Sequence, residues 1–260
     1  MRECMDVMLL AVLQGIAEFL PISSSGHLVL AQSLLKINMP GVRLEVVLHL
    51  GTMVSIMAYY RTALWNLACG VLRGRRASWT TLGHIIVSAI PAAFFYYLCH
   101  DKVDAFYEDP RAVSGFLVFT GIVLLALRWM RCGDGPVTGA RALLTGIAQA
   151  LAVLPGISRS GMTIAAARMA GIAPGRAAEF SFLMCLPLLA GAALLDYLGF
   201  TAQPGAADGL PGWLLLAGAA VSATVGYAAL AVLVRTLRGG RFWLFGVYCI
   251  AAGLITLFAA

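Results

Sequence analysis

The sequence predicts an all-α polytopic membrane protein with six spanning helices and two re-entrant helix hairpins in an inverted-topology repeat. Three observations support this: an apolar composition, apolar segments of spanning length, and an internal repeat. Hydrophobic residues make up 61% of the 260 residues and charged residues 12%, whereas soluble domains contain about 45–50% and about 25% respectively. The composition excludes a soluble domain, a disordered chain and a coiled coil, and it lacks the alternating pattern of an outer-membrane barrel.

Six apolar segments are long enough, or nearly so, to cross a bilayer. At 1.5 Å per helical residue each reaches roughly 25–33 Å, which matches a hydrocarbon core of ~30 Å. The six are Leu44–Tyr60, Leu82–Leu98, Val113–Met130, Phe180–Leu198, Trp213–Val234 and Phe242–Phe258.

Four further apolar segments are too short and come in two pairs. Met5–Leu20 is paired with Leu28–Leu35, and Leu143–Leu154 with Met162–Ile172. A polar stretch of Pro, Gly and Ser interrupts each pair. Lipid tolerates such pieces only where they are buried in protein or line a wet cavity, so we expect two re-entrant hairpins.

The charges of the connections predict the orientation. Arginine gathers in 61–81, 128–141 and 235–241, whereas 99–112 carries four acidic residues against two basic ones and 199–211 has only Asp208. The positive-inside rule places the first group in the cytoplasm and the second group outside. This orientation requires the pair within 143–172 to leave and return on the same side.

An internal repeat relates the two halves of what we expect to be one membrane domain, residues 1–260. Gln14–Leu28 aligns with Gln149–Thr163 with six identities in fifteen positions. Three long apolar helices follow each break, and an odd number of spans makes the second hairpin enter from the opposite face. Repeats of roughly 5–130 and 140–258 would then be inverted, with a substrate site near the bilayer midplane where the broken helices meet.

The two breaks contain the candidate binding groups. The first reads EFLPISSSGH over 18–27 and the second reads LPGISRSGMT over 154–163. Each places a proline before hydroxyl side chains at the start of a helix, where unpaired N–H groups and Ser caps favour an anion. Arg159 adds a forked, permanently charged guanidinium that suits phosphate. Helix capping and hairpin packing would by themselves also explain the serines.

Glu18, His27 and Arg159 are the ionisable residues of the breaks. A charge at the bilayer centre costs at least ~2.5–3.5 kcal/mol and indicates function by default. A Glu–Arg pair that only holds the hairpins together is the structural alternative, and it leaves His27 without a role. In the hydrolytic interpretation Ser24 attacks phosphorus, His27 takes its proton, and Arg159 stabilises the transferring phosphoryl group. A rival mechanism makes His27 the nucleophile, and the sequence leaves both open.

Glu18 and Gln14 lie one helical turn apart and are the candidate ligands of a divalent cation, although Glu18 could instead position His27. We expect His49, His84 and His100 to be helix-packing or interfacial residues. The six cysteines are scattered singly, which predicts neither a zinc site nor a disulfide framework.

At these residues the sequence resembles the bacterial undecaprenyl-pyrophosphate phosphatase family, the class linked to bacitracin resistance. The resemblance covers essentially the whole length and includes Gln14–Glu18, the motifs at 19–27 and 155–163, and Glu179–Phe182. It implies removal of the terminal phosphate from undecaprenyl pyrophosphate, dependence on Mg2+ or Ca2+, and an active site that opens to the periplasmic side of the inner membrane. Gln14 stands where many relatives have Glu. Because its amide is neutral, metal binding would depend mainly on the Glu18 carboxylate.

The resemblance also implies roles for individual residues. Glu18, Ser24, His27 and Arg159 would be catalytic, and Glu18 and Gln14 would hold the metal. The substrate contacts would be Ser23, Ser25, Gly26, Ser158, Ser160, Thr163 and Gln14.

Two functional hypotheses follow. The first is an enzyme that recycles the lipid carrier of peptidoglycan synthesis and so bears on cell shape and antibiotic resistance. The second is a secondary transporter or flippase for a phosphorylated lipid or another anion, because inverted repeats with broken helices are typical of transporters. Either protein would have the bilayer and a polyprenyl pyrophosphate or similar anion as partners, without nucleic acid, and a homodimer is compatible with both.

Overall fold

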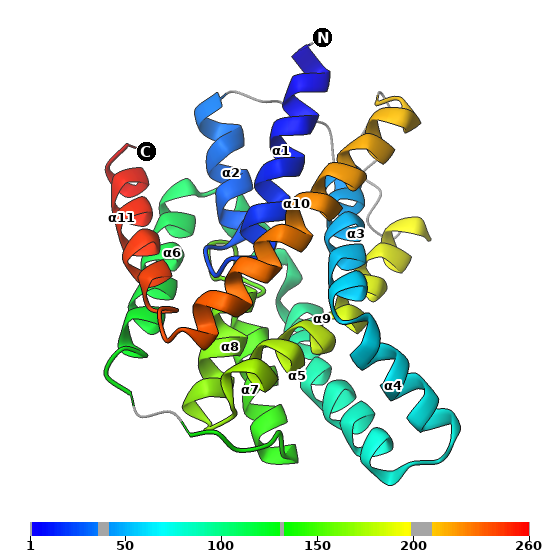
Figure 1. Cartoon of the computed structure of the whole chain (residues 1–260). Coiled ribbons are helices and arrows are strands. Elements are labelled where there is room, and N and C mark those ends of the chain that lie inside the picture. The colour runs from blue at the N-terminus through cyan, green and yellow to red at the C-terminus, as the bar shows by residue number, and fades with distance from the viewer. Residues whose placement is uncertain (1, 36–41, 131–132, 199–209, 260) are drawn as a thin grey trace.

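The computed structural model describes residues 2–35, 42–130, 133–198 and 210–259. Within these ranges the regular structure is helical, with one isolated bridge between Gly135 and Ile172 (Figure 1). The helices are α1 (Arg2–Phe19), α2 (Ser24–Leu35), α3 (Val42–Tyr59), α4 (Arg61–Leu72), α5 (Arg76–Tyr107), α6 (Pro110–Ala126), α7 (Gly139–Leu151), α8 (Arg159–Met169), α9 (Pro174–Tyr197), α10 (Gly212–Arg238) and α11 (Leu244–Ala259).

The apolar segments confirm a multi-pass membrane protein. Helices α5, α9 and α10 are long and apolar enough to cross a bilayer, and α3, α6 and α11 carry shorter apolar stretches. All six predicted spans therefore fall on helices, but only three meet the length of a full span. Helix α6 ends at Ala126, four residues before the predicted end, and Arg128 then stacks 4.4 Å over the ring of Trp243.

Several helices continue into the predicted connections. Most of 61–81 is helical, because α4 and the first turns of α5 occupy it. The break between them is at Gly74, whose φ of +66° suits a residue without a Cβ. Helix α5 runs on to Tyr107 and stops where Asp109 caps the start of α6 with Pro110 in its first turn. Most of the predicted outer connection 199–211 lies outside the described residues.

Small residues allow the helices to approach closely. A Cβ added to Gly121 of α6 would lie 2.7 Å from the carbonyl oxygen of Gly246 in α11, and one added to Gly146 of α7 would lie 2.5 Å from that of Ser88 in α5. Membrane helices gain van der Waals contact in this way, since lipid supplies no hydrophobic drive between them.

The two breaks meet in the middle of the molecule. In Figure 1, α1 and α2 lie in the upper half and α7 and α8 in the lower half, with their turns adjacent. The contact is close at both turns: a Cβ on Gly26 would lie 3.0 Å from Cα of Gly156, and one on Gly161 would lie 3.2 Å from Cβ of Pro21. Because glycine occupies both contact points, the starts of α2 and α8 can face each other.

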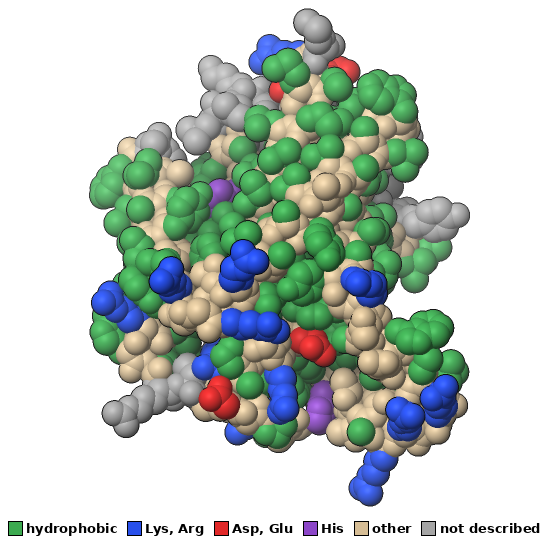
Figure 2. All heavy atoms as spheres, viewed as in Figure 1, with side chains coloured by type: hydrophobic (Ala, Val, Ile, Leu, Met, Phe, Trp, Pro, Cys, Tyr) green, Lys and Arg blue, Asp and Glu red, His purple; other side chains and the backbone are tan. Residues whose placement is uncertain are grey.

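The surface separates apolar and basic regions. Figure 2 shows hydrophobic side chains over most of the upper part of this face, whereas most Lys and Arg side chains lie in its lower half. Large apolar side chains such as Leu216 and Ile255 are exposed on the outer helices, as expected of helices that face lipid.

The α6–α11 crossing supplies a test of the packing. We expect Gly121→Leu to lower the stability of the protein in detergent by ~1–3 kcal/mol, because the new side chain overpacks the contact with α11. Gly115→Leu on the same helix is the matched control, since a Cβ there meets nothing within 4 Å. Thermal unfolding of both variants checks the prediction, and equal melting temperatures would contradict it.

Candidate functional site

The site is organised around the buried carboxylate of Glu18, in the last turn of α1. One oxygen, Oε1, forms an ion pair with Nη2 of Arg159 from α8. The other oxygen, Oε2, accepts hydrogen bonds from the Ser24 hydroxyl at 2.7 Å and from the Gln14 amide at 3.1 Å. Nε2 of His49 lies 3.5 Å from the same oxygen. Four elements of the fold, α1, α2, α3 and α8, therefore meet at one carboxylate.

Arg159 is only partly satisfied by this pairing. Its Nη2 contacts Glu18, while its Nη1 is buried and has no hydrogen-bond partner among the described residues. The thiol of Cys185 lies beside the guanidinium, but a thiol is a weak acceptor. A buried N–H donor without a partner costs about 1–3 kcal/mol, so a stronger acceptor than the Cys185 thiol would be favourable at Nη1.

The starts of α2 and α8 are capped in the same way. The hydroxyl of Ser23 accepts from the N–H of Gly26 at 3.2 Å, and that of Ser158 accepts from the N–H of Gly161 at 3.1 Å. A second serine follows each cap in the same geometry. The Ser25 Oγ lies 3.3 Å from the Ser23 Oγ, and the Ser160 Oγ lies 3.3 Å from the Ser158 Oγ. Helices α2 and α8 begin at Ser24 and Arg159, and the remaining N–H groups of both first turns leave a partial positive charge at this point.

Ser24 and His27, predicted to form a nucleophile–base pair, are turned to different partners. The single hydroxyl proton of Ser24 is donated to Glu18 and so does not bond His27. His27 instead places Nδ1 2.9 Å from the carbonyl oxygen of Ser23 and Nε2 2.8 Å from the hydroxyl of Tyr248. The prediction that His27 takes the Ser24 proton is therefore not supported by this geometry, because the Glu18 carboxylate accepts the hydrogen bond from the Ser24 hydroxyl.

His49 is the site residue that the sequence prediction missed. It was expected to be a packing or interfacial residue, yet its Nε2 faces Glu18. Its Nδ1 lies 2.7 Å from the Glu45 carbonyl oxygen, which can only accept, so Nδ1 carries a proton. The available signal was the polar stripe on α3, where His49 is followed by the buried Thr52 and Ser55.

The other predicted contacts have structural partners. Thr163 donates to the Arg159 carbonyl oxygen at 2.7 Å and lies 2.6 Å from the Ser181 hydroxyl. These contacts hold the first turn of α8 against α9. The hydroxyls of Ser158 and Ser160 are also buried. Their roles as substrate contacts stay predictions.

Gln14 and Glu18 carry oxygen atoms of the kind that bind hard divalent cations, but the Gln14 amide N–H, not its oxygen, faces Glu18. Among the described residues no three His, Cys, Asp or Glu side chains form a group that could hold a metal. However, Oε1 of Gln14 is fully buried and has no hydrogen-bond partner among the residues that the structure describes. A carboxylate and an unpaired amide carbonyl are the oxygen ligands that Mg2+ and Ca2+ prefer, with the remaining positions left to water and phosphate.

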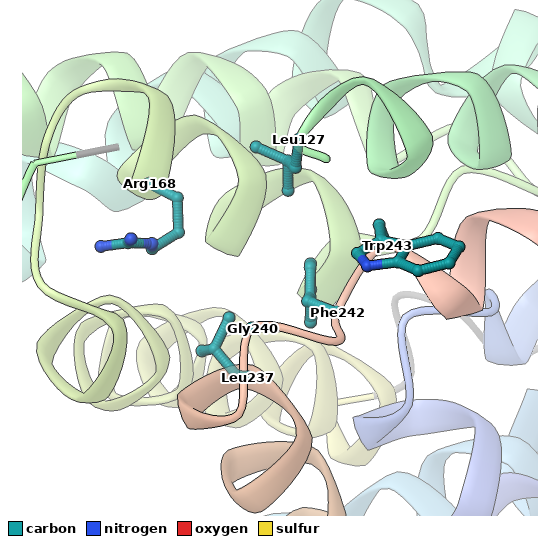
Figure 3. Close-up of a pocket in the computed structure, with 6 residues that line it drawn as sticks. All are labelled: Leu127, Arg168, Leu237, Gly240, Phe242 and Trp243. Carbon is teal, nitrogen blue, oxygen red and sulfur yellow. The ribbon is translucent and has the colours of Figure 1, made fainter. Parts of the chain in front are cut away.

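A separate pocket lies at the far end of α8 (Figure 3). It is lined by Leu127, Arg168, Leu237, Gly240, Phe242 and Trp243. Arg168 is about nine residues, or ~14 Å of helix, from Arg159. Its Nη1 donates to the carbonyl oxygens of Gly133 and Ile172 at 2.9 and 2.5 Å, so the cation is used to hold the adjoining loop.

Fold and site together define a multi-pass membrane protein with a buried carboxylate–guanidinium site between two helix N-termini. The chain belongs to the family described as bacitracin resistance protein BacA, whose model matches residues 7–255. Three similar proteins are each named undecaprenyl-diphosphatase. The protein of Desulfosudis oleivorans is 37% identical and that of Desulfatibacillum aliphaticivorans 38%, each with 98% of both chains covered. The protein of Salinibacter ruber is 37% identical, with 95% of this chain and 96% of its own length covered.

The ion pair gives a testable energetic prediction. We expect Glu18→Gln to destabilise the protein by about 3–5 kcal/mol, because Arg159 would remain buried without its counter-charge. Arg159→Gln should cost a similar amount for the converse reason. In the double variant no charge remains unpaired, so its loss should be smaller than the sum of the single losses. Thermal unfolding in detergent measures all three, and strictly additive losses would show that the two side chains do not interact.

Proposed function

We propose that this protein is a membrane phosphatase that hydrolyses undecaprenyl pyrophosphate to undecaprenyl phosphate and inorganic phosphate. The observation that carries the proposal is that one carboxylate, Glu18, pairs with Nη2 of Arg159 and accepts from the Ser24 hydroxyl, while Nη1 of Arg159 has no hydrogen-bond partner among the described residues. Family membership and the names of the full-length relatives support the same substrate. In a bacterial inner membrane this reaction returns the lipid carrier to peptidoglycan synthesis.

The geometry favours Ser24 as the nucleophile and Glu18 as the acceptor of its proton. The hydroxyl and carboxylate oxygens are 2.7 Å apart, which is hydrogen-bond reach for a general base. Attack by Ser24 Oγ on the terminal phosphorus would break the bridging P–O bond and release undecaprenyl phosphate. Water would then hydrolyse the phosphoserine. Nη1 of Arg159 and the N–H groups of α2 and α8 would stabilise the charge of the transferring phosphoryl group.

His27 is the alternative nucleophile. Its protonated Nδ1 leaves the lone pair on Nε2, the atom that would attack phosphorus in that mechanism. Ser24 would then bind phosphate only. The two mechanisms differ in the covalent intermediate, a phosphoserine or a phosphohistidine, and trapping of the intermediate distinguishes them.

A divalent cation such as Mg2+ or Ca2+ belongs to this proposal. Glu18 and Gln14 would hold it, and when bound it would neutralise charge on the phosphate oxygens. Gln14 would have to turn its amide oxygen toward Glu18. That turn exchanges the present N–H donor for the buried, unpaired Oε1.

The finer architecture is also a proposal. We infer that the α1–α2 and α7–α8 pairs are re-entrant hairpins of an inverted repeat, with six spans and a site that opens to the periplasmic side. The matched Ser23–Gly26 and Ser158–Gly161 caps support the repeat, as does the meeting of the two turns from opposite ends of the molecule (Figure 1).

Phosphate release from undecaprenyl pyrophosphate in detergent tests the activity. We expect Ser24→Ala and Arg159→Ala each to lower the rate at least 100-fold, since each removes a group that acts on the transferring phosphoryl. EDTA should abolish activity, and added Mg2+ should restore it. Ser114→Ala, a buried serine bonded to Thr256 of α11, is the control. A wild-type protein that binds the lipid without releasing phosphate would overturn the proposal in favour of an anion transporter or flippase.

Position 14 tests the metal. We expect Gln14→Glu to be tolerated and to lower the Mg2+ concentration for half-maximal activity, because a second carboxylate would face Glu18 about where the amide now lies 3.1 Å away. Two such carboxylates repel one another unless a cation lies between them. Activity titrated against Mg2+ in both proteins gives the result. An unchanged half-saturation point would argue against a metal role for this position.

A further inference from the structure

Tyr248 of α11 is the partner of His27, although 221 residues separate them in the sequence. Its hydroxyl lies 2.8 Å from Nε2, and the two rings are stacked with centroids 5.7 Å apart and planes 15° from parallel. The adjoining Cys249 is buried and its thiol lies 3.3 Å from the carbonyl oxygen of Pro21 in the first break. Helix α11 is thus anchored to the break at two consecutive residues.

The hydrogen bonds of His27 determine which nitrogen carries the proton. The Ser23 carbonyl oxygen can only accept, so Nδ1 donates to it. The same oxygen accepts from the backbone N–H of His27 at 3.1 Å. Ser23 has a φ of +69°, a conformation that few non-glycine residues adopt, and both bonds to its carbonyl stabilise it. The neutral ring then has its lone pair on Nε2, where the Tyr248 hydroxyl donates.

We propose that Tyr248 is a positioning residue, which holds the His27 ring of the phosphatase site in one orientation and one tautomer, with its proton on Nδ1 and its lone pair on Nε2. This inference rests on the proposed function, in which His27 is the alternative nucleophile. A phenol hydroxyl can donate to neutral Nε2 and can accept from it once it is protonated. Tyr248 can therefore keep the ring in one orientation through a proton transfer, while stacking restricts its rotation.

The half-exposed position of Tyr248 suits this role. Its side chain is 46% exposed on α11, whereas His27 is half-buried at the start of α2. The Tyr248 ring therefore covers the His27 ring on its outer side and is not part of the hydrophobic core. Removal of its hydroxyl should leave the packing of α11 intact, because the close contacts of that helix run through Gly246 and Gly253.

The experiment joins a spectroscopic measurement to kinetics. The four histidines are labelled with 15N in purified protein in detergent, and His27→Gln assigns the His27 signals. We expect the wild-type ring to carry its proton on Nδ1, and Tyr248→Phe to shift the Nε2 resonance. In phosphate release we expect Tyr248→Phe to lower kcat about ten-fold, with KM changed less than two-fold, because a misplaced group reacts more slowly without weaker substrate binding.

Two comparisons separate positioning from a general structural role. Tyr227→Phe is the matched control, since Tyr227 is a similarly exposed tyrosine whose ring packs edge-on against Tyr59; we expect no change in kcat. In a His27→Ala background, Tyr248→Phe should cause no further loss.

Three results would overturn the proposal: a proton on Nε2, an unmoved Nε2 signal in Tyr248→Phe, or an equal rate loss with and without His27. If the wild type releases no phosphate, the proposed function fails and the catalytic role of Tyr248 fails with it. The NMR result would still report the contact, so the two failures can be told apart.

Discussion

The ion pair between Glu18 and Arg159 is the interaction on which the rest of the site depends. It joins the last residues of α1 to the first residue of α8, and so it holds together two breaks that are far apart in the sequence. An isolated charge in this apolar setting would be costly, and removal of one partner of a buried pair leaves that cost uncompensated. The pair requires the two turns to meet closely, and Gly26 and Gly161 permit this because neither carries a Cβ. The apolar composition, the close approach of the two breaks and the charge pairing therefore all depend on the contact between Glu18 and Arg159.

The local part of this arrangement follows from the sequence. Proline followed by Ser and Gly specifies a helix start, and the observed caps at Ser23 and Ser158 are those that a Ser–x–x–Gly stretch allows. Charged residues inside an apolar chain identify Glu18 and Arg159 without knowledge of the fold. The apolar runs likewise predict where helices lie, although not where they end. Helix α4 arises in a stretch whose arginines resemble a connection.

Contacts between distant elements could not be predicted in the same way. Tyr248 lies in an ordinary apolar helix, and only the packing of α11 against the first break brings it to His27. His49 reaches Glu18 because α3 packs beside α1, and the internal repeat gives no hint since its counterpart position holds Met184. The expected hydrogen bond between Ser24 and His27 is not formed in the structure, for a related reason. Spacing along one helix indicates that two side chains are neighbours, but a carboxylate from another helix supplies a stronger acceptor for the hydroxyl.

Charge balance within the site bears on how substrate could bind. Glu18 and Arg159 cancel one another, so the resting pair offers little net attraction for a pyrophosphate. The helix N-termini contribute only about half a charge each. A pyrophosphate would bind Nη1 of Arg159, which has no hydrogen-bond partner in the described part of the chain, and would compete with Glu18 for the rest of the guanidinium. That competition would weaken the ion pair between Arg159 and the carboxylate and leave Glu18 a better acceptor for the Ser24 proton.

The added negative charge would still need compensation, and a cation at Gln14 and Glu18 would supply it where the carboxylate and phosphate meet. Under the proposed function, substrate, metal and base would be interdependent, because each one would correct a charge imbalance that another creates.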